Sequence, residues 1–290
     1  MPDPVELFEV GPRDGLQNEP RPIPASDKVA LVDLLSQAGF RRIEVASFVS
    51  PKWVPQMADG AEVLAGIARV PGVRYAALTP NLRGYQAARA AGADEVAIFA
   101  SASEAFSKAN LNATIAESLD RFAEVAAAAR ADGMPVRGYV SMVTDCPFEG
   151  PVAPAAVARV AAALLGMGCY EISLGDTIGQ GRPETVDRML DAVTREVAPY
   201  RLAGHFHDTA GRALANIEAA LAHGVRVFDT SAGGLGGCPY APGAAGNVAT
   251  EAVAARMAAL GHETGLDRGA LDRAAAFARG LRASREGERA

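Results

Sequence analysis

The chain has 290 residues, of which 49% are hydrophobic and 21% charged, and its net charge is −6. This size and composition are typical of a globular protein with a large core and exclude an intrinsically disordered chain. The acidic balance argues against nucleic-acid binding, and no apolar run reaches the length of a membrane span. We expect no secretory signal at the N-terminus. Three scattered cysteines without a CxxC pair favour a reducing, cytoplasmic setting.

Short segments rich in Val, Ile, Leu, Phe or Tyr alternate along the chain with Ala-rich segments of helical length. The short segments suit strands that are buried on both faces. In chain order, the predicted strands are Val5–Val10, Arg42–Phe48, Val73–Thr79, Glu95–Ala100, Val136–Met142, Tyr170–Leu174, Leu202–His207 and Arg226–Ser231. The predicted helices are Ser26–Ala38, Leu82–Ala91, Asn112–Asp132, Pro154–Leu165, Pro183–Val197, Ala210–Ala222 and Asn247–Ala259.

The helix predicted at Asn112–Asp132 has the clearest end signals. Thr114 and Glu117 form the pattern of a capping box, in which each side chain bonds to the backbone of the other. Gly133 follows the last turn and is suited to end the helix.

Eight strands that alternate with helices predict an α/β fold of the (β/α)₈ TIM-barrel type. We expect one catalytic domain over residues 1–290, with the barrel at about 4–262 and a helical extension at about 263–290. A helix is predicted there at Asp267–Arg282. The alternative is a doubly wound open sheet, which usually has a GxGxxG motif after its first strand. Here the first strand runs into GPRDG at residues 11–15, so the barrel is favoured.

The most specific local pattern is His205-x-His207 on the seventh predicted strand. Residues two apart on a strand face the same side, so both imidazoles can reach one metal ion. Asp14 and Asn247 are oxygen donors at the ends of other strands, where the chemistry of a barrel is located. Such a donor set favours Mg²⁺ or Mn²⁺. Asn247 is also suited to cap the helix that follows it.

The segment from Gly233 to Asn247 contains six glycines and one cysteine, Cys238. Glycines permit the backbone to move, which suits a lid over an active site. A thiol with an ordinary pKa near 8.5 is mostly protonated at neutral pH and can donate a proton to a carbanion.

Four separated motifs together resemble the 3-hydroxy-3-methylglutaryl-CoA lyases over about residues 4–262. They are GPRDGLQNE at 11–19, SLGDTIG at 173–179, HFHDT at 205–209 and GLGGCPYA at 234–241. The resemblance implies cleavage of an acyl-CoA thioester, hydroxymethylglutaryl-CoA, to acetyl-CoA and acetoacetate. It also implies a Mg²⁺ or Mn²⁺ cofactor, a homodimer, and a role in leucine degradation or ketone-body formation.

The same resemblance assigns roles to individual residues. The implied metal ligands are Asp14, His205, His207 and Asn247. The implied catalytic residues are Arg13 at the thioester oxygen, Cys238 on the loop, Asp176 and His205 as acid or base, and Glu44 as the support of Arg13. The implied substrate-binding residues are Arg13, Gln17, Ser47, Asn110, Ser173 and Thr177. The stretch 143–148 departs from the usual pattern, which bears on acyl specificity.

Three alternatives stay open at the level of sequence. Claisen-condensing synthases of the same superfamily share the Arg-Asp-Gly and His-x-His motifs, but usually lack the Cys-bearing loop and carry a longer C-terminal region. A second alternative is a lyase for a longer 3-hydroxy-3-acylglutaryl-CoA. The third is a metal-binding barrel without catalytic activity.

Overall fold

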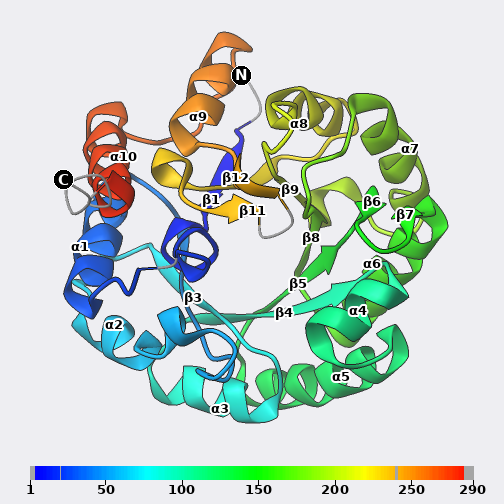
Figure 1. Ribbon diagram of the computed structural model, residues 1–290, viewed down its shortest axis with the longest axis horizontal. Coiled ribbons are helices and arrows are strands. Elements are labelled where there is room, and N and C mark those ends of the chain that lie inside the picture. Colours follow the sequence, from blue (N-terminus) through cyan, green and yellow to red (C-terminus); the bar gives the residue numbers. More distant parts are fainter. Residues whose placement is uncertain (1–3, 20, 239–240, 284–290) are drawn as a thin grey trace.

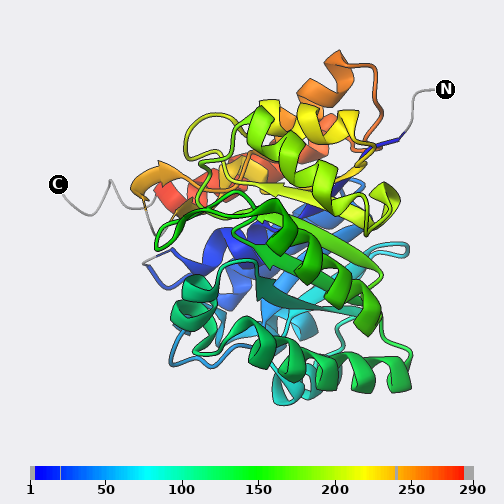
Figure 2. The same cartoon turned by 90° about the vertical axis from the view of Figure 1, so that its right-hand side faces the viewer.

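The protein folds as a closed barrel of eight parallel strands in a computed structural model that describes residues 4–19, 21–238 and 241–283. Around the barrel the strand order is β1-β10-β9-β8-β5-β4-β3-β2, and helices surround it (Figures 1 and 2). This confirms the predicted TIM barrel and excludes the open sheet. The barrel strands are β1 (Glu6–Glu9), β2 (Arg42–Ser47), β3 (Arg74–Leu78), β4 (Glu95–Ser101), β5 (Val136–Ser141), β8 (Glu171–Asp176), β9 (Leu202–Phe206) and β10 (Val227–Thr230).

The helical layer begins and ends on the same side of the barrel, because α10 packs beside α1 (Figure 1). The backbone amide of Asp267 donates to the carbonyl of Ala38 at 2.9 Å and fixes the start of α10 there. The helices are α1 (Ala25–Ser36), α2 (Gly60–Gly66), α3 (Leu82–Ala90), α4 (Glu104–Leu111), α5 (Ile115–Asp132), α6 (Pro154–Met167), α7 (Pro183–Val193), α8 (Ala213–Ala222), α9 (Thr250–Ala259) and α10 (Arg268–Ala283). None of the helices in the described ranges is long and apolar enough to cross a membrane.

Alternation along each strand divides its side chains between the helical layer and the barrel interior. On β5, Val136 and Val140 join the apolar core, whereas Arg137 and Tyr139 form a polar network with side chains of other strands. The guanidinium of Arg137 is fully buried and lies 4.3 Å from the ring centroid of Phe8. The interior of this barrel is therefore charged, and its charges lead toward the candidate site.

The predicted strands are all present, but several other boundaries were wrong. The sequence analysis missed α2, α4 and two hairpins, β6 (Asp145–Cys146) with β7 (Gly150–Pro151) and β11 (Gly237–Cys238) with β12 (Ala241–Ala245). The helix predicted from Asn112 begins at Ile115, because Asn112 adopts a left-handed φ of 50° at the end of α4. Its predicted capping box between Thr114 and Glu117 is confirmed.

Two further helices begin later than predicted. The helix expected from Ala210 begins at Ala213, after Gly211 with its φ of +67°. The helix expected from Asn247 begins at Thr250 and has Ala249 at its cap position. Asn247 therefore does not cap α9, and it forms an antiparallel bridge with His207 instead.

Candidate active site

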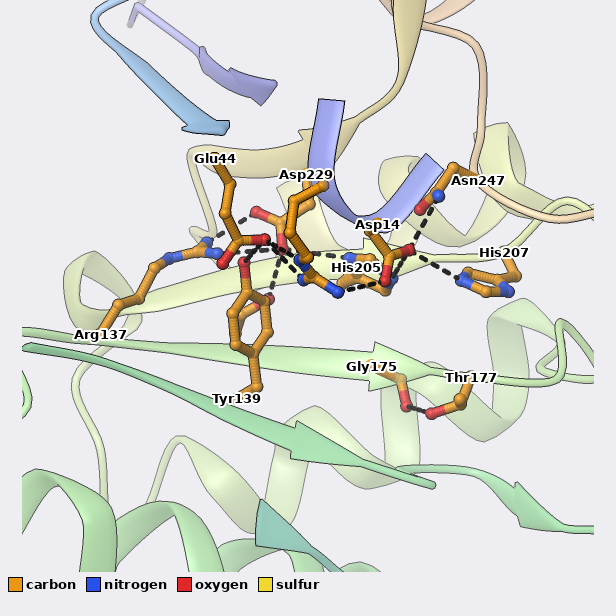
Figure 3. Close-up of polar contacts among 12 residues, drawn as sticks. Asp14, Glu44, Arg137, Tyr139, Gly175, Thr177, His205, His207, Asp229 and Asn247 are labelled. Atoms are coloured by element: carbon orange, nitrogen blue, oxygen red, sulfur yellow. Dashed lines mark hydrogen bonds and ion pairs between the residues drawn. The ribbon is translucent and has the colours of Figure 1, made fainter. Parts of the chain in front are cut away.

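Three ligand-bearing side chains converge at the carboxyl end of the barrel. The ligand atoms of Asp14, His205 and His207 all lie within 4.8 Å of one another (Figure 3). Nε2 of His205 is 3.9 Å, and Nε2 of His207 is 4.0 Å, from Oδ2 of Asp14. This convergence is what the sequence analysis predicted for these three residues.

Strand geometry explains how the two imidazoles meet. His205 is on β9 and His207 follows its end, so both side chains point to the same face, with ring centroids 5.1 Å apart. Phe206 between them packs in the apolar core on the opposite face.

A single π-helical turn, Gly11–Gly15, brings Asp14 to the histidines. It follows β1 directly, and the carbonyl of Val10 accepts the backbone amides of Arg13, Asp14 and Gly15. Such turns occur frequently at functional sites. Here the turn directs two adjacent side chains to different partners, Asp14 toward the histidines and Arg13 toward Glu44.

Asn247 reaches the same cluster from the segment after β12. Its bridge with His207 places its amide beside Asp14, and its Nδ2 donates to Oδ2 of Asp14 at 2.8 Å. Gly236 leaves room for this amide, since a Cβ there would lie 2.9 Å from the Nδ2 atom. The four residues predicted as metal ligands are thus neighbours.

The charge states of Asp14 and His207 suit a cation. Burial alone would raise the pKa of Asp14, but Arg13 and the two histidines lower it to about 2, so the carboxylate is ionised. Burial and the neighbouring His205 lower the pKa of His207 to about 4, so this imidazole is neutral with a free lone pair. Burial alone would lower the pKa of His205, but Asp229 outweighs it and raises the pKa.

The donor set fits a divalent metal ion on chemical grounds. One ionised carboxylate, two buried imidazoles and one amide come together. Carboxylate and amide oxygens suit Mg²⁺ and Mn²⁺, and imidazoles suit several transition metals.

Arg13 lies next to this cluster and is itself held firmly. Its Nε donates to Oε2 of Glu44 at 2.6 Å, its Nη2 lies 2.5 Å from the same oxygen, and its Nη1 lies 2.5 Å from Oδ1 of Asp14. Tyr139 donates its hydroxyl to Oε2 of Glu44 at 3.3 Å. Burial alone would lower the pKa of Arg13, but the two carboxylates raise it well above its ordinary value, so the guanidinium is permanently charged.

Asp176 is near the barrel end but faces a different direction. Its carboxylate accepts the backbone amides of Gln180 and Gly181 at 3.2 and 2.9 Å and the hydroxyl of Thr144 at 3.1 Å. Its backbone carbonyl accepts the amide of His207 at 3.4 Å, but among the described residues no side-chain contact joins its carboxylate to the metal-ligand cluster. Burial raises its pKa. Its role as an acid or base stays a prediction.

The residues predicted to bind substrate are distributed around the cluster. Gln17 donates to Oδ1 of Asp14 at 3.2 Å, and Thr177 accepts the backbone amide of Met142 at 3.1 Å. Ser47 is buried at the end of β2, and Asn110 is exposed on α4. Ser173 is fully buried and donates to Asp229 at 2.8 Å.

Cys238 is the predicted residue about which the structure says least. Its backbone belongs to β11, paired with Ala241, but its side chain lies outside the described part of the chain, as do residues 239 and 240 of its motif. The pairing gives the Gly-rich segment a hairpin that the sequence analysis did not predict. The catalytic role of the thiol stays a prediction.

A cavity of about 480 Å³ is lined by residues outside the cluster. It is lined by the segment after β5, including Val143 and Cys146, by Arg182 just before α7 and by Met189 within α7. None of the four predicted metal ligands lines it, so the chemistry of the ligand cluster identifies the site better than cavity size does.

Sequence analysis missed three polar residues of the site, Arg137, Tyr139 and Asp229. All three are buried on barrel strands and contact predicted site residues directly or through one another. The sequence signal for them was a charged residue inside a predicted buried strand. Burying a charge without a partner is costly, so such a residue indicates that an oppositely charged group lies nearby.

Comparison with known proteins identifies the family of this chain. Residues 4–277 match the protein-family model described as HMGL-like. The chain belongs to the HMGL-like family. Within the family, it is 59% identical over 271 residues to a 3-hydroxy-3-isohexenylglutaryl-CoA/hydroxymethylglutaryl-CoA lyase of Pseudomonas aeruginosa, covering 93% of this chain and 90% of that relative.

Solved HMG-CoA lyases share the fold of this HMGL-like chain. The Brucella melitensis enzyme has a TM-score of 0.96 and 58% identity, with 97% of this chain and 99% of that chain covered. An Acinetobacter baumannii enzyme in complex with coenzyme A and 3-methylmalate has a TM-score of 0.91 and 39% identity, with 96% and 91% covered. The resemblance inferred from the four motifs is thereby confirmed.

Proposed function

We propose that the protein cleaves 3-hydroxy-3-methylglutaryl-CoA into acetyl-CoA and acetoacetate with the help of a divalent cation, Mg²⁺ or Mn²⁺. The observation that carries the proposal is the convergence of Asp14, His205 and His207 within 4.8 Å, beside the buried guanidinium of Arg13. Names of relatives at 59% and 58% identity support the substrate.

The cleavage breaks a carbon–carbon bond after a tertiary hydroxyl has lost its proton, and it leaves negative charge on the thioester oxygen. Asp14, His205, His207 and Asn247 would hold the cation. When bound, such a cation acts as a Lewis acid that stabilises negative charge on substrate oxygens.

Arg13 is placed to stabilise the thioester oxygen. A guanidinium has five N–H donors. Three of its N–H directions are taken by Glu44 and Asp14, so two donors remain for a substrate oxygen. Because both carboxylates fix the guanidinium in advance, it does not need to reorient as the charge develops, which is the basis of oxyanion stabilisation.

The remaining roles follow the family resemblance. We assign protonation of the enolate carbon to Cys238, and we retain Asp176 and His205 as the other candidates for proton transfer. Gln17, Ser47, Asn110, Ser173 and Thr177 are the proposed substrate contacts. Of these, Gln17 is directly linked to the metal-ligand cluster, through Asp14.

A substrate with a longer 3-acyl chain is the second candidate. It is favoured by the Pseudomonas aeruginosa relative, whose name includes the isohexenyl substrate as well as the methyl one. Parallel assays with both thioesters would separate the two candidates by their ratio of kcat/KM.

The test begins with protein that has been treated with EDTA and desalted. Acetoacetate formed from hydroxymethylglutaryl-CoA is measured with and without added Mg²⁺ or Mn²⁺, and we expect activity only with the cation. Absence of acetoacetate above the metal-free control would refute the proposal. Incubation with acetyl-CoA and a 2-oxo acid tests the condensing synthases in the same experiment.

We also propose that the lyase is a cytoplasmic homodimer that acts in leucine degradation or ketone-body formation. These points rest on the family resemblance. Sedimentation of the purified protein tests the dimer, and growth of a deletion strain on leucine tests the pathway.

A further inference from the structure

Asp229 lies behind the metal-ligand cluster, at the centre of a fully buried polar network (Figure 3). Its Oδ2 accepts Nη1 of Arg137 at 3.0 Å and the hydroxyl of Ser173 at 2.8 Å, and it lies 3.1 Å from Nδ1 of His205. Its Oδ1 accepts Nη2 of Arg137 at 2.6 Å. The carboxylate therefore joins the barrel interior to one of the proposed ligands.

The chemistry of these groups determines which nitrogen of His205 carries the proton. An ionised carboxylate can only accept hydrogen bonds, so His205 must donate from Nδ1. Arg137 can only donate, and its two contacts hold the carboxylate plane in place. The lone pair of the neutral imidazole is then on Nε2, the nitrogen that faces Asp14.

We infer that Asp229 is a positioning residue for the metal site, which fixes His205 in the Nδ1–H tautomer so that Nε2 is free to bind the divalent cation. Arg137 supports this role by preventing the carboxylate from rotating. The inference rests on the proposed metal site but not on the identity of the thioester substrate.

The second histidine provides a contrast inside the same site. Nδ1 of His207 is buried and has no hydrogen-bond partner in the described part of the chain. Among the described residues, no carboxylate contact at Nδ1 therefore determines which nitrogen of His207 carries the proton. Of the two imidazoles, His205 is the one whose ligand nitrogen is set before a cation arrives.

Asp229→Asn tests the inference, because an amide cannot satisfy the same partners. If the amide oxygen of the new asparagine takes the place of Oδ2, the amide NH₂ group lies opposite Nη2 of Arg137. Both groups are donors, so no hydrogen bond can form between them. If the amide is turned over, its NH₂ group faces Nδ1 of His205 and favours the proton on Nε2, which blocks metal binding. Loss of such an indirect contact typically weakens metal affinity by about 10- to 100-fold.

The measurement is Mn²⁺ affinity by electron paramagnetic resonance, which needs no substrate. We expect the Asp229→Asn variant to bind Mn²⁺ about 10- to 100-fold more weakly than the wild type. Glu95→Gln is the matched control, because Glu95 is a buried barrel carboxylate that contacts Tyr170 and Arg74 but no proposed ligand. We expect the affinity of this control to be unchanged. Wild-type affinity in a folded Asp229→Asn variant would overturn the inference.

A second measurement needs no variant and covers the case in which Asp229→Asn does not fold. In ¹⁵N-labelled wild-type protein with diamagnetic Mg²⁺, the ring nitrogens of His205 report their protonation directly. A proton on Nδ1 supports the inference, and a proton on Nε2 overturns it. Failure of the proposed lyase reaction would appear as missing acetoacetate and would leave both readouts unaffected.

Discussion

Replacing Arg13 with glutamine removes the group proposed to meet the developing charge on the thioester oxygen. Loss of one fixed oxyanion donor costs about 10²- to 10³-fold in kcat, or roughly 2.7–4 kcal/mol. We expect a loss of at least this size here, because the lost donor also carries a full positive charge and is only 5% exposed.

The same substitution has a separate effect on folding. Glu44 is 0% exposed, and without Arg13 its remaining hydrogen bond to a described residue is the one from Tyr139 at 3.3 Å. Breaking a buried ion pair by removing one partner costs about 3–5 kcal/mol, because the other charge stays buried. A drop in the activity of the Arg13→Gln variant could therefore come from lost catalysis or from lost stability, and this variant alone does not distinguish the two.

The double variant Arg13→Gln/Glu44→Gln separates the two effects. It removes the unpaired carboxylate, so we expect most of the lost free energy of unfolding to return while kcat/KM stays low. Urea unfolding and acetoacetate formation are measured on the wild type, both single variants and the double variant. Arg69→Gln is the control, since Arg69 forms an exposed pair with Asp94 and such pairs contribute about 0–1 kcal/mol. Recovery of activity in the double variant would refute the role of Arg13.

Three further predictions concern protons and packing. The first is that Mn²⁺ affinity should fall as the pH drops, because protons compete with the metal for the imidazole of His205. Since the pKa of His205 is raised, the fall should begin above the ordinary histidine pKa of 6.5. A constant affinity between pH 8 and pH 5 would contradict this. The second concerns Glu9, whose pKa is raised by burial from 4.5 to about 7, so the folded state binds the proton of Glu9 more tightly than the unfolded state does. The free energy of unfolding should therefore fall by up to about 3 kcal/mol as the pH rises from about 4.5 to about 7. Glu9→Gln should remove that part of the pH dependence in urea unfolding, and an identical pH profile would argue against it. Gly204→Ala should lower stability by about 1–3 kcal/mol, because its Cβ would lie 2.6 Å from the ring of Phe206 and 3.0 Å from that of Phe228; an unchanged unfolding midpoint would show that these rings move aside.

The features predicted correctly from sequence depend on short-range patterns. The barrel strands are short segments rich in Val, Ile, Leu, Phe or Tyr. His205 and His207 share a face because side chains alternate along a strand. The capping box at Thr114 is equally local. These patterns are determined within a few residues, so they can be recognised before the chain is folded.

The features that were missed depend on which strands become neighbours. Arg137 and Asp229 are 92 residues apart, and only closure of the barrel brings them together. Asparagine is a residue type that often caps helices, but Asn247 forms a bridge with His207 instead, which sequence alone does not show. Asp176 is part of a recognisable motif, but its carboxylate accepts backbone amides of the turn before α7. No sequence pattern indicates where that side chain points.

The charges of the barrel interior are compatible with a bound divalent cation. Acidic and basic side chains alternate along one continuous series of contacts that ends at Arg13 and Glu44. Its members in order are Glu6, Arg42, Glu171, Arg137, Asp229, His205, Asp14, Arg13 and Glu44. When His205 is neutral as a metal ligand and all five carboxylates are ionised, the carboxylates face three guanidinium groups in this series, an excess of two negative charges. Buried charges are tolerated when they are paired, so a dication bound between Asp14 and His205 would balance the whole series.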